Sequence, residues 1–325
     1  MREVAELLRR AERVTAICHE NPDGDTLGAA IAIAIAAERL GKQSEVVSGD
    51  PPPPFLSVLP RVEQVRSAPA LEPDLAVIVD TGDLARTGRV AAEHGEWLSR
   101  ATIAVVDHHV SNVGFGAANW IDPRAAATCE MVALLLPELG VEIDAEVATA
   151  LLTGIVQDTH TFAHPNATPR TLRVAADLVE AGAPLSGLNR AVYADKPFST
   201  LALWGRMLAT IDQRCDGRIV HASMTADMLI AVGEHPSASE GFVDLLASTK
   251  AADVTVLFKQ IEEGSTRVSV RTTERADAVA IASAFGGGGH ARAAGCTVQA
   301  PIAMARELVL AECERELARA DAGGR

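Results

Sequence analysis

The sequence predicts an α/β fold whose first half forms a doubly wound, mostly parallel sheet. Short apolar runs alternate there with longer runs rich in alanine and isoleucine, and polar loops separate them. The short runs are apolar at nearly every position, which is typical of strands that are buried on both faces. Helices that cover both sides of a parallel sheet produce this combination.

Five segments of the first half carry the pattern. We expect buried strands over residues 14–18, 75–79 and 102–106, and helices over residues 27–40 and 145–157. Gly41 closes the first of these helices, and Asp144 stands where the N-cap of the second should be.

The alternation ends in turn residues near Gly182, where we place the domain boundary. The predicted parts are a first domain over residues 1–185, a linker helix over residues 186–212 and a smaller α/β domain over residues 213–325. In the last part we expect strands over residues 218–224, 254–261 and 267–272, with the last two joined as a hairpin, and helices over residues 240–248, 277–285 and 301–320 before a Gly-rich tail.

The composition is that of a folded protein. The chain has 325 residues, of which 48% are hydrophobic, enough for about two domains. No uninterrupted apolar stretch reaches the roughly 18 residues of a membrane helix, and the first residues are acidic where a signal peptide would be basic. The five cysteines are scattered and form no C-x-x-C pair. We therefore expect a cytoplasmic protein that does not bind membranes.

The chain is acidic, with a formal net charge of −14, and only 3% of its residues are aromatic. Proteins that bind long nucleic acids neutralise many phosphates with Lys and Arg, and those that bind single strands also stack bases on aromatic rings. The composition thus argues against long nucleic acid as a partner but permits a short anionic substrate in one local site. It leaves open whether the chain forms a homodimer.

Residue types that bind metal ions follow three of the predicted strands and end one predicted helix. They are His19, Asp23 and Asp25 after the first strand, Asp80 after the second, Asp107, His108 and His109 after the third, and Asp158 at the end of the helix. The carboxyl ends of parallel strands meet at one sheet edge, where such folds place their active sites. Carboxylate and imidazole ligands without thiolates favour Mn²⁺ or Mg²⁺ over structural zinc.

An aspartate after a strand is usually a turn or capping residue, and Asp83 or Asp122 alone would be interpreted that way. Here, however, four segments deliver metal-binding residues to the same edge. Carboxylates gathered there without cations would repel one another and raise each other's pKa. Two divalent ions about 3.5–4 Å apart would relieve that repulsion and stabilise the attacking and leaving oxygens of a phosphoryl transfer.

The order of these motifs resembles the DHH phosphoesterase family. The four family motifs correspond in order to His19-x-x-x-Asp23-x-Asp25, Asp80, Asp107-His108-His109 and Asp158. Gly286-Gly-Gly-Gly-His290 resembles the glycine-rich motif of the DHH-associated C-terminal domain. The motifs cover nearly the whole chain. Its length and layout resemble the NrnA-type enzymes, which degrade RNA of a few nucleotides and dephosphorylate pAp (3′-phosphoadenosine 5′-phosphate).

The resemblance implies two divalent metal ions, Mn²⁺ first with Mg²⁺ or Co²⁺ as alternatives, and a bridging Asp80. The implied ligands of one ion are His19, Asp23 and Asp80, and those of the other are Asp25, Asp80, His108 and Asp158. His109 would face the scissile phosphate, and Asp107 would orient the groups around it. The implied activity is hydrolysis of short RNA from one end, together with dephosphorylation of pAp.

The resemblance implies that the second domain binds the nucleotide. Four consecutive glycines let backbone N–H groups approach an anion closely, as in phosphate-binding nests. Arg271 and His290 can add side-chain donors. The predicted substrate contacts are Arg271, Gly287, Gly288, Gly289 and His290.

One segment departs from the family pattern, and it leaves the substrate open. After Asp158, relatives carry a Gly and a basic residue near a Phe, whereas this chain reads Thr159-His160-Thr161-Phe162-Ala163-His164. One alternative is a phosphodiesterase for cyclic di-AMP or linear pApA, and another is a nucleotide-binding module that has lost catalysis. A family II inorganic pyrophosphatase fits less well, because its second domain lacks the glycine run and histidine.

Overall fold

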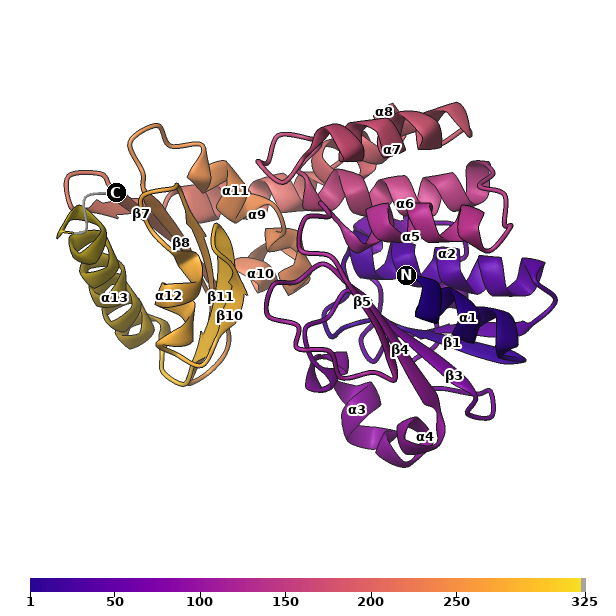
Figure 1. Cartoon of the computed structure of the whole chain (residues 1–325). Helices are drawn as coiled ribbons and strands as arrows, with labels where there is room; N and C mark the ends of the chain where they lie inside the picture. The colour runs from indigo at the N-terminus through magenta and orange to yellow at the C-terminus, as the bar shows by residue number, and fades with distance from the viewer. Residues whose placement is uncertain (323–325) are drawn as a thin grey trace. The chain divides into compact units, whose positions relative to one another are not determined.

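The computed structural model describes residues 1–322, with all side chains except that of Ile261. The chain forms two compact units, one over Met1–Asp195 and a second that begins at Lys196 (Figure 1). Three short helical segments surround this division, namely α8 (Leu185–Asn189), a π-helical turn (Arg190–Ala194) and α9 (Phe198–Leu208). Pro197 precedes α9, because proline fits the start of a helix but not its interior. The Gly-rich tail expected at the end of the chain lies outside the described residues.

The first unit is built on a sheet of five parallel strands in the order β2-β1-β3-β4-β5. The strands are β1 (Arg13–Ile17), β2 (Gln43–Val47), β3 (Leu75–Val79), β4 (Thr102–Asp107) and β5 (Ala118–Ile121). The strand order reverses between β1 and β3, and such a reversal opens a crevice at the carboxyl ends of the two strands. The predicted doubly wound, parallel fold is confirmed.

Helices cover both faces of this sheet (Figure 1). One face shares an apolar core with α1 (Arg2–Arg10), α2 (Gly24–Arg39), α5 (Thr128–Glu138), α6 (Ala145–Asp158) and α7 (Pro169–Glu180). The other face packs against α3 (Arg89–Glu93) and α4 (Gly95–Arg100). Helix α2 is buried over its whole first fourteen residues, because it lies between the sheet and α6.

The sequence reasoning did not single out β2 and β5. Strand β2 begins with the polar residues Gln43, Ser44 and Glu45, and most of β5 is only half-buried. These two are the edge strands of the sheet. An edge strand is less completely covered than a central one, so its sequence lacks the uninterrupted apolar run that identifies a buried strand.

The second unit contains a mixed sheet of six strands in the order β10-β11-β9-β8-β7-β6. Strands β7 and β8 run parallel, and the other neighbours are antiparallel. The strands are β6 (Asp212–Arg214), β7 (Ile219–Thr225), β8 (Val254–Glu262), β9 (Ser265–Thr272), β10 (Gly288–His290) and β11 (Ala293–Val298). The predicted hairpin joins β8 to β9 through Glu263 and Gly264.

Helices pack on both faces of the second sheet as well. Helices α9, α10 (Ala226–Val232) and α11 (Phe242–Ala247) share an apolar core with β7 and β8. Helices α12 (Ala278–Ser283) and α13 (Ile302–Ala322) cover the opposite face. None of the described helices combines the length and the apolarity that crossing a bilayer would require.

Candidate metal centre

The carboxyl ends of β1, β3 and β4 bring the predicted ligands together. His19 follows β1 by two residues, and Asp80 follows β3 directly. The backbone of Asp80 has a φ of 58°, a left-handed conformation that costs about 1–2 kcal/mol in residues other than glycine. Its N–H donates to the Val106 carbonyl at 2.9 Å, which fixes the turn. Backbone strain of this kind persists where the surrounding structure holds a functional side chain in one direction.

The first ligand group consists of His19, Asp23 and Asp80, whose ligand atoms all lie within 4.8 Å of one another. The Nε2 atom of His19 is 3.7 Å from Asp23 Oδ1 and 3.4 Å from Asp80 Oδ2. Its Nδ1 lies 2.7 Å from the Glu20 carbonyl, an acceptor that places the proton on Nδ1 and turns Nε2 toward the carboxylates. Asp23 also caps α2 by accepting the N–H groups of Asp25 and Thr26.

The second group consists of Asp25, Asp80 and His108, again with ligand atoms within 4.8 Å of one another. His108 Nε2 is 3.4 Å from Asp80 Oδ1 and 3.9 Å from Asp25 Oδ2. It is also 3.2 Å from an oxygen of Asp158, the last residue of α6. Its Nδ1 lies 3.2 Å from the Ala125 carbonyl, which orients this imidazole as Glu20 orients His19.

Asp80 is common to both groups, and its two oxygens point to different imidazoles. Oδ2 faces His19 and Oδ1 faces His108. The hydroxyl of Thr128 donates to Oδ1 at 3.1 Å, and Asp80 is almost completely buried. A carboxylate with one oxygen directed to each of two ligand groups is suited to bridge two cations held close together.

Asp25 is held from the opposite direction by the start of α5. The backbone N–H groups of Thr128 and Cys129 donate to its two oxygens at 2.6 and 2.8 Å. Helix α6 approaches the same carboxylate at Gly154, where a β-carbon would lie 2.7 Å from Asp25 Oδ1. Glycine at this position therefore leaves the space that Asp25 occupies.

The two residues predicted to take part in catalysis contact each other. His109 Nδ1 lies 2.7 Å from Asp107 Oδ1, and Asp107 is fully buried. The side-chain amide of Asn112 donates to the other oxygen of Asp107 at 2.7 Å. The carboxylate thereby fixes the tautomer and the direction of the His109 ring, as an acceptor beside an imidazole does in many catalytic sites.

The charges of the centre push its carboxyl pKa values apart. Burial raises the pKa of Asp25 well above its ordinary value, and the charges of Asp80 and Asp158 raise it further. Burial also raises the pKa of Asp158, to about 6, although His108 opposes the effect. Asp80 is buried too, but His108 and His19 hold its pKa well below the ordinary value. Added cations would offset both the burial and the repulsion that raise the pKa values of Asp25 and Asp158.

Two buried thiols lie beside the centre without joining it. Cys129 Sγ donates to the Asp25 carbonyl at 3.3 Å, and Cys18 Sγ donates to the Thr26 carbonyl at 3.7 Å. Burial raises the pKa of both thiols, so neither offers a thiolate. The donor set is therefore carboxylate and imidazole, which fits Mn²⁺, Mg²⁺ or Co²⁺.

Comparison with known proteins agrees with the motif order. A model of the DHH family N-terminal domain matches residues 13–155, and a model of the DHHA1 domain matches residues 218–318. The chain is 37% identical, over 98% of its own length and 95% of the relative's, to a Thermus thermophilus protein named bifunctional oligoribonuclease and PAP phosphatase NrnA. The chain belongs to the DHH family. The predicted resemblance and enzyme class, a DHH hydrolase, are confirmed.

Two further comparisons, one of sequence and one of structure, agree with this result. A Bacillus subtilis protein of the same name is 25% identical over 86% of this chain and 87% of its own. A crystal structure of an exopolyphosphatase-related protein from Bacteroides fragilis superimposes with a TM-score of 0.84 and 22% identity, over 98% of this chain and 95% of that one. The second comparison supports the fold of both DHH-family units.

The segment that departs from the family pattern forms a tight turn after Asp158. His160, Thr161 and Phe162 all have left-handed backbones, with φ between 47° and 64°. The rings of His160 and His164 stack with centroids 5.2 Å apart, and the Asn166 side chain donates to the Asp158 carbonyl at 3.2 Å. The two histidines thus lie at the end of the helix that carries a predicted ligand.

The predicted substrate contacts of the second unit lie on β9 and β10. Arg271 pairs with Asp244 of α11, Nε to Oδ1 at 2.7 Å. Arg271 is opposite Ala293 in the sheet register, and Ala293 is opposite His290, so the Arg271 and His290 side chains share one face. The glycine run follows α12, and its last two glycines lie in the edge strand β10. At Gly287 a β-carbon would lie 2.2 Å from the Gly295 carbonyl, so glycine allows β10 to approach β11.

A network of polar side chains also holds the candidate ligands in place, and the sequence alone does not predict it. Glu130 of α5 is fully buried and accepts from Arg170 Nε, from the Thr171 hydroxyl at 2.7 Å and from the Ala126 N–H at 3.1 Å. Arg170 also donates to Asp122 at 3.0 Å. The network fixes residues 122–128, the loop that supplies Ala125 to His108 and Thr128 to Asp25 and Asp80. Its members are distant in sequence, and no spacing pattern joins them.

Replacing Arg170 by methionine is expected to weaken Mn²⁺ binding about tenfold, the lower end of the effect seen when residues that orient metal ligands are removed. The cause is the loss of the ion pair that anchors this loop, which leaves Glu130 buried without its cation. Mn²⁺ titration of the metal-free protein measures the effect. The control is Arg173→Met, an exposed position on the same helix. Unchanged Mn²⁺ affinity in the Arg170 variant would mean that the loop keeps its position without this ion pair.

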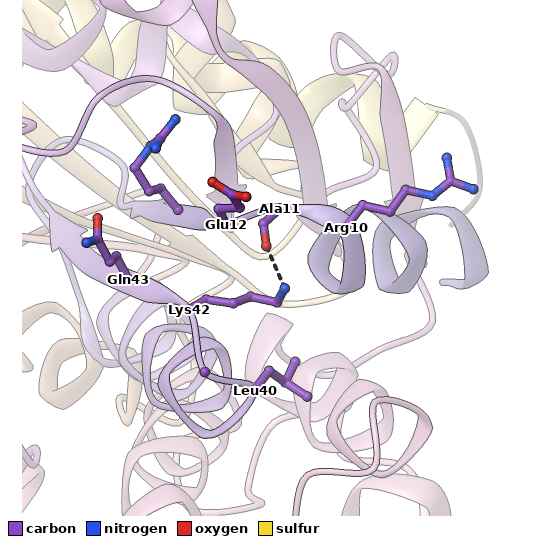
Figure 2. Close-up of a pocket in the computed structure, with 8 residues that line it drawn as sticks. Arg10, Ala11, Glu12, Leu40, Lys42 and Gln43 are labelled. Atoms are coloured by element: carbon purple, nitrogen blue, oxygen red, sulfur yellow. Dashed lines mark hydrogen bonds between the residues drawn. The ribbon is translucent and has the colours of Figure 1, made fainter.

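One cavity of the first unit lies away from these residues. It has a volume of about 440 Å³ and is lined by residues 10–13 and 40–43, at the amino ends of β1 and β2 (Figure 2). Lys42 donates there to the Ala11 carbonyl. None of the predicted site residues lines this cavity. The candidate metal centre lies at the carboxyl ends of the strands, at the other edge of the same sheet.

Proposed function

We propose that this DHH enzyme uses two divalent metal ions to hydrolyse short oligoribonucleotides, one nucleotide at a time from an end, and to dephosphorylate pAp. The observation that carries the proposal is the position of Asp80, with one oxygen toward each of two ligand groups. The name of the Thermus thermophilus relative, a bifunctional oligoribonuclease and PAP phosphatase, supports the substrate class.

The proposed ligands of one ion are His19, Asp23 and Asp80, and those of the other are Asp25, Asp80, His108 and Asp158. We propose Mn²⁺ as the native metal, with Mg²⁺ or Co²⁺ as substitutes, because the donors are carboxylates and imidazoles. When bound, two such ions lower the pKa of water and stabilise negative charge on the attacking and leaving oxygens.

The chain's own groups would position the substrate. Burial lowers the pKa of His109, but Asp107 and Asp80 raise it overall, so the protonated ring, oriented by Asp107, would donate from Nε2 to an oxygen of the scissile phosphate. In the second unit Arg271, His290 and the backbone of Gly287, Gly288 and Gly289 would hold the nucleotide by phosphate. Asp244 limits the motion of the Arg271 side chain, so that its remaining guanidinium N–H groups have a defined direction.

The proposed partners are short RNA and small nucleotides. A local phosphate site on a chain with a net charge of −14 gains little from each further phosphate of a long polyanion, which the surrounding charge repels. We propose the cytoplasm as its place of action, since all five cysteines are unpaired thiols.

A panel of substrates tests the proposal. Initial rates with Mn²⁺ are expected to be highest for RNA of two to about five nucleotides and for pAp. They should fall about tenfold or more for RNA of about 24 nucleotides, a length beyond a single-strand binding site of roughly 4–16 nucleotides. Chelation should abolish turnover, and added Mn²⁺ should restore it.

The same panel separates the alternatives. Preference for cyclic di-AMP over pAp and dinucleotides would move the enzyme to cyclic dinucleotide turnover. Rates that rise steadily with RNA length would contradict the short-substrate proposal. Binding of nucleotides without turnover of any panel member, at every metal tested, would support a module that has lost catalysis.

A further inference from the structure

One face of the second sheet carries a row of basic side chains. In β9, Arg267, Ser269 and Arg271 point to one side, while Val268 and Val270 point into the core beneath α12 and α13. The register places Lys259 of β8 directly opposite Arg267. Lys259 is on the same side as Leu257, which packs in the core beneath α9, α10 and α11. Lys259, Arg267 and Arg271 therefore share one face of the sheet.

This face is only partly covered by helices. Helices α9, α10 and α11 pack over β7 and the middle of β8, and Asp244 of α11 reaches as far as Arg271. Beyond them, Arg267 of β9, Thr297 of β11 and His290 of β10 are exposed. In the sheet, β9 lies between β8 and β11, and β10 pairs with β11 at the edge. Within the row Arg267 is exposed and Lys259 and Arg271 are half-buried, so a ligand can reach the row at Arg267.

Lys259 and Arg267 bring two like charges to directly opposite positions of neighbouring strands. Side chains directly opposite each other on neighbouring strands lie about 4.5–5.5 Å apart at their β-carbons, and like charges in such pairs destabilise a sheet. Among the described residues, no carboxylate oxygen lies within 4 Å of the Lys259 ammonium group. Burial lowers the pKa of Lys259, Glu240 partly offsets this, and the charges of Arg267 and Arg271 lower it further. An anion between these cations would remove the repulsion.

The row of basic side chains extends along the sheet over more than the width of one phosphate group. Arg267 and Arg271 are four residues apart on β9, a separation of about 13 Å at the rise of a strand. Arg271 lies in register with His290, whereas Lys259 lies in register with Arg267. Two separate pairs of donors therefore follow one another along the face, each suited to one phosphate group.

We propose that Lys259 and Arg267 form a second phosphate subsite beside Arg271 and His290, which takes the phosphate next to the scissile one. The proposal rests on the proposed function, since it assigns the ligand as a nucleotide with at least two phosphate groups. It predicts a preference for substrates with a second phosphate.

A substrate pair that differs by one phosphate tests this subsite. ApA contains one phosphate and pApA contains two. Wild-type enzyme is expected to have a KM for pApA about tenfold below that for ApA, the effect of one charge-assisted contact. In Lys259→Met the KM for pApA should rise to that of ApA, while the KM for ApA stays unchanged. Lys259→Arg should keep most of the preference.

Two controls make the result specific. Lys250→Met removes an exposed lysine of the same unit and should leave both KM values unchanged. Binding of pApA and ApA to the metal-free protein, measured by calorimetry, gives the same comparison without turnover. A Tm equal to that of the wild type shows that the variant is folded, and Lys259→Gln serves as a second variant if the methionine lowers it.

The outcomes separate the two proposals. Equal affinity of wild-type protein for ApA and pApA, or an equal loss for both in Lys259→Met, overturns the second subsite even if the enzyme hydrolyses both. Absence of turnover in the wild type overturns the proposed function. In that case a pApA preference in binding that Lys259→Met removes still supports the subsite.

Discussion

Replacing Asp80 by alanine is expected to lower kcat by at least about 10³-fold, because one carboxylate is proposed to serve both metal ions and each ion contributes several kcal/mol of charge stabilisation. The fold should survive, since Asp80 adopts a left-handed backbone that alanine makes only modestly less favourable. Steady-state rates with pAp and a dinucleotide, together with a Mn²⁺ titration, measure the effect. Loss of detectable binding for at least one of the two ions should accompany the loss of rate.

Asp83→Ala is the matched control, because Asp83 lies three residues away and is exposed. Its side chain caps a short 3₁₀ helix by accepting the Arg86 N–H, and it contacts none of the ligand groups. Removing a cap costs about 0.5–2 kcal/mol of stability, and it should change kcat little. A comparable loss of rate in both variants would show that Asp80 is not the bridge.

Without metal, the protein is expected to lose stability as the pH rises from about 5 to 8. Burial lowers the pKa of His19 and His108, but the carboxylates around them outweigh it and raise both pKa values well above 6.5. A raised histidine pKa gives stability that is present below the ordinary pKa and lost as the pH rises through the folded-state pKa. The raised pKa of Asp158 acts in the same direction, from 3.8 up to about 6.

Asp80 acts in the opposite direction but outside this range. Its pKa is lowered, so its contribution is complete above the ordinary value of 3.8 and does not change between pH 5 and 8. Mn²⁺ binds the deprotonated ligands, so the stabilisation by Mn²⁺ should grow with pH. At 100 times its Kd a ligand adds about 2.7 kcal/mol, or about 5–10 °C in Tm for a unit of this size.

Thermal melts in chelator and in Mn²⁺, at several pH values, measure both effects. The Mn²⁺ shift should be small near pH 5 and largest near pH 8. Asp80→Ala should show little shift at any pH. A shift that is equal at pH 5 and pH 8 would contradict the assignment of these buried groups as the ligands.

Much of the first unit could be predicted because its buried elements have a simple pattern. The central strands β3 and β4 are apolar at nearly every position, and the candidate ligands lie at or directly after their carboxyl ends, so the sequence predicts strand and site together. The edge strands β2 and β5 carry polar residues, so the pattern of buried strands does not predict them. Parallel pairing across the sheet could be inferred from the alternation with helices, but the order of strands could not.

The sequence predicts candidate ligands because each of them follows a strand or ends a helix in a recognisable motif. It does not predict the groups that hold those ligands. Thr128 and Arg170 contact Asp80 and Glu130 across 48 and 40 residues of sequence. Such contacts depend on how α5 and α7 pack, and no local spacing encodes them. The row formed by Lys259 and Arg267 needs the register of β8 and β9, which the hairpin pattern alone leaves undefined.

Asp23 and Asp25 are candidate metal ligands that also accept hydrogen bonds at helix starts. These two roles affect which residues would change if a descendant of this protein lost its activity. Asp23 caps α2, and Asp25 accepts two backbone N–H groups at the start of α5. Natural selection for folding alone would retain both residues after the loss of turnover. His109 has no such duty toward a helix end in the contacts described above. A lineage that abandons hydrolysis should therefore keep Asp23 and Asp25 of the first motif while His109 of the third motif changes, and His109 is the better marker of an active enzyme.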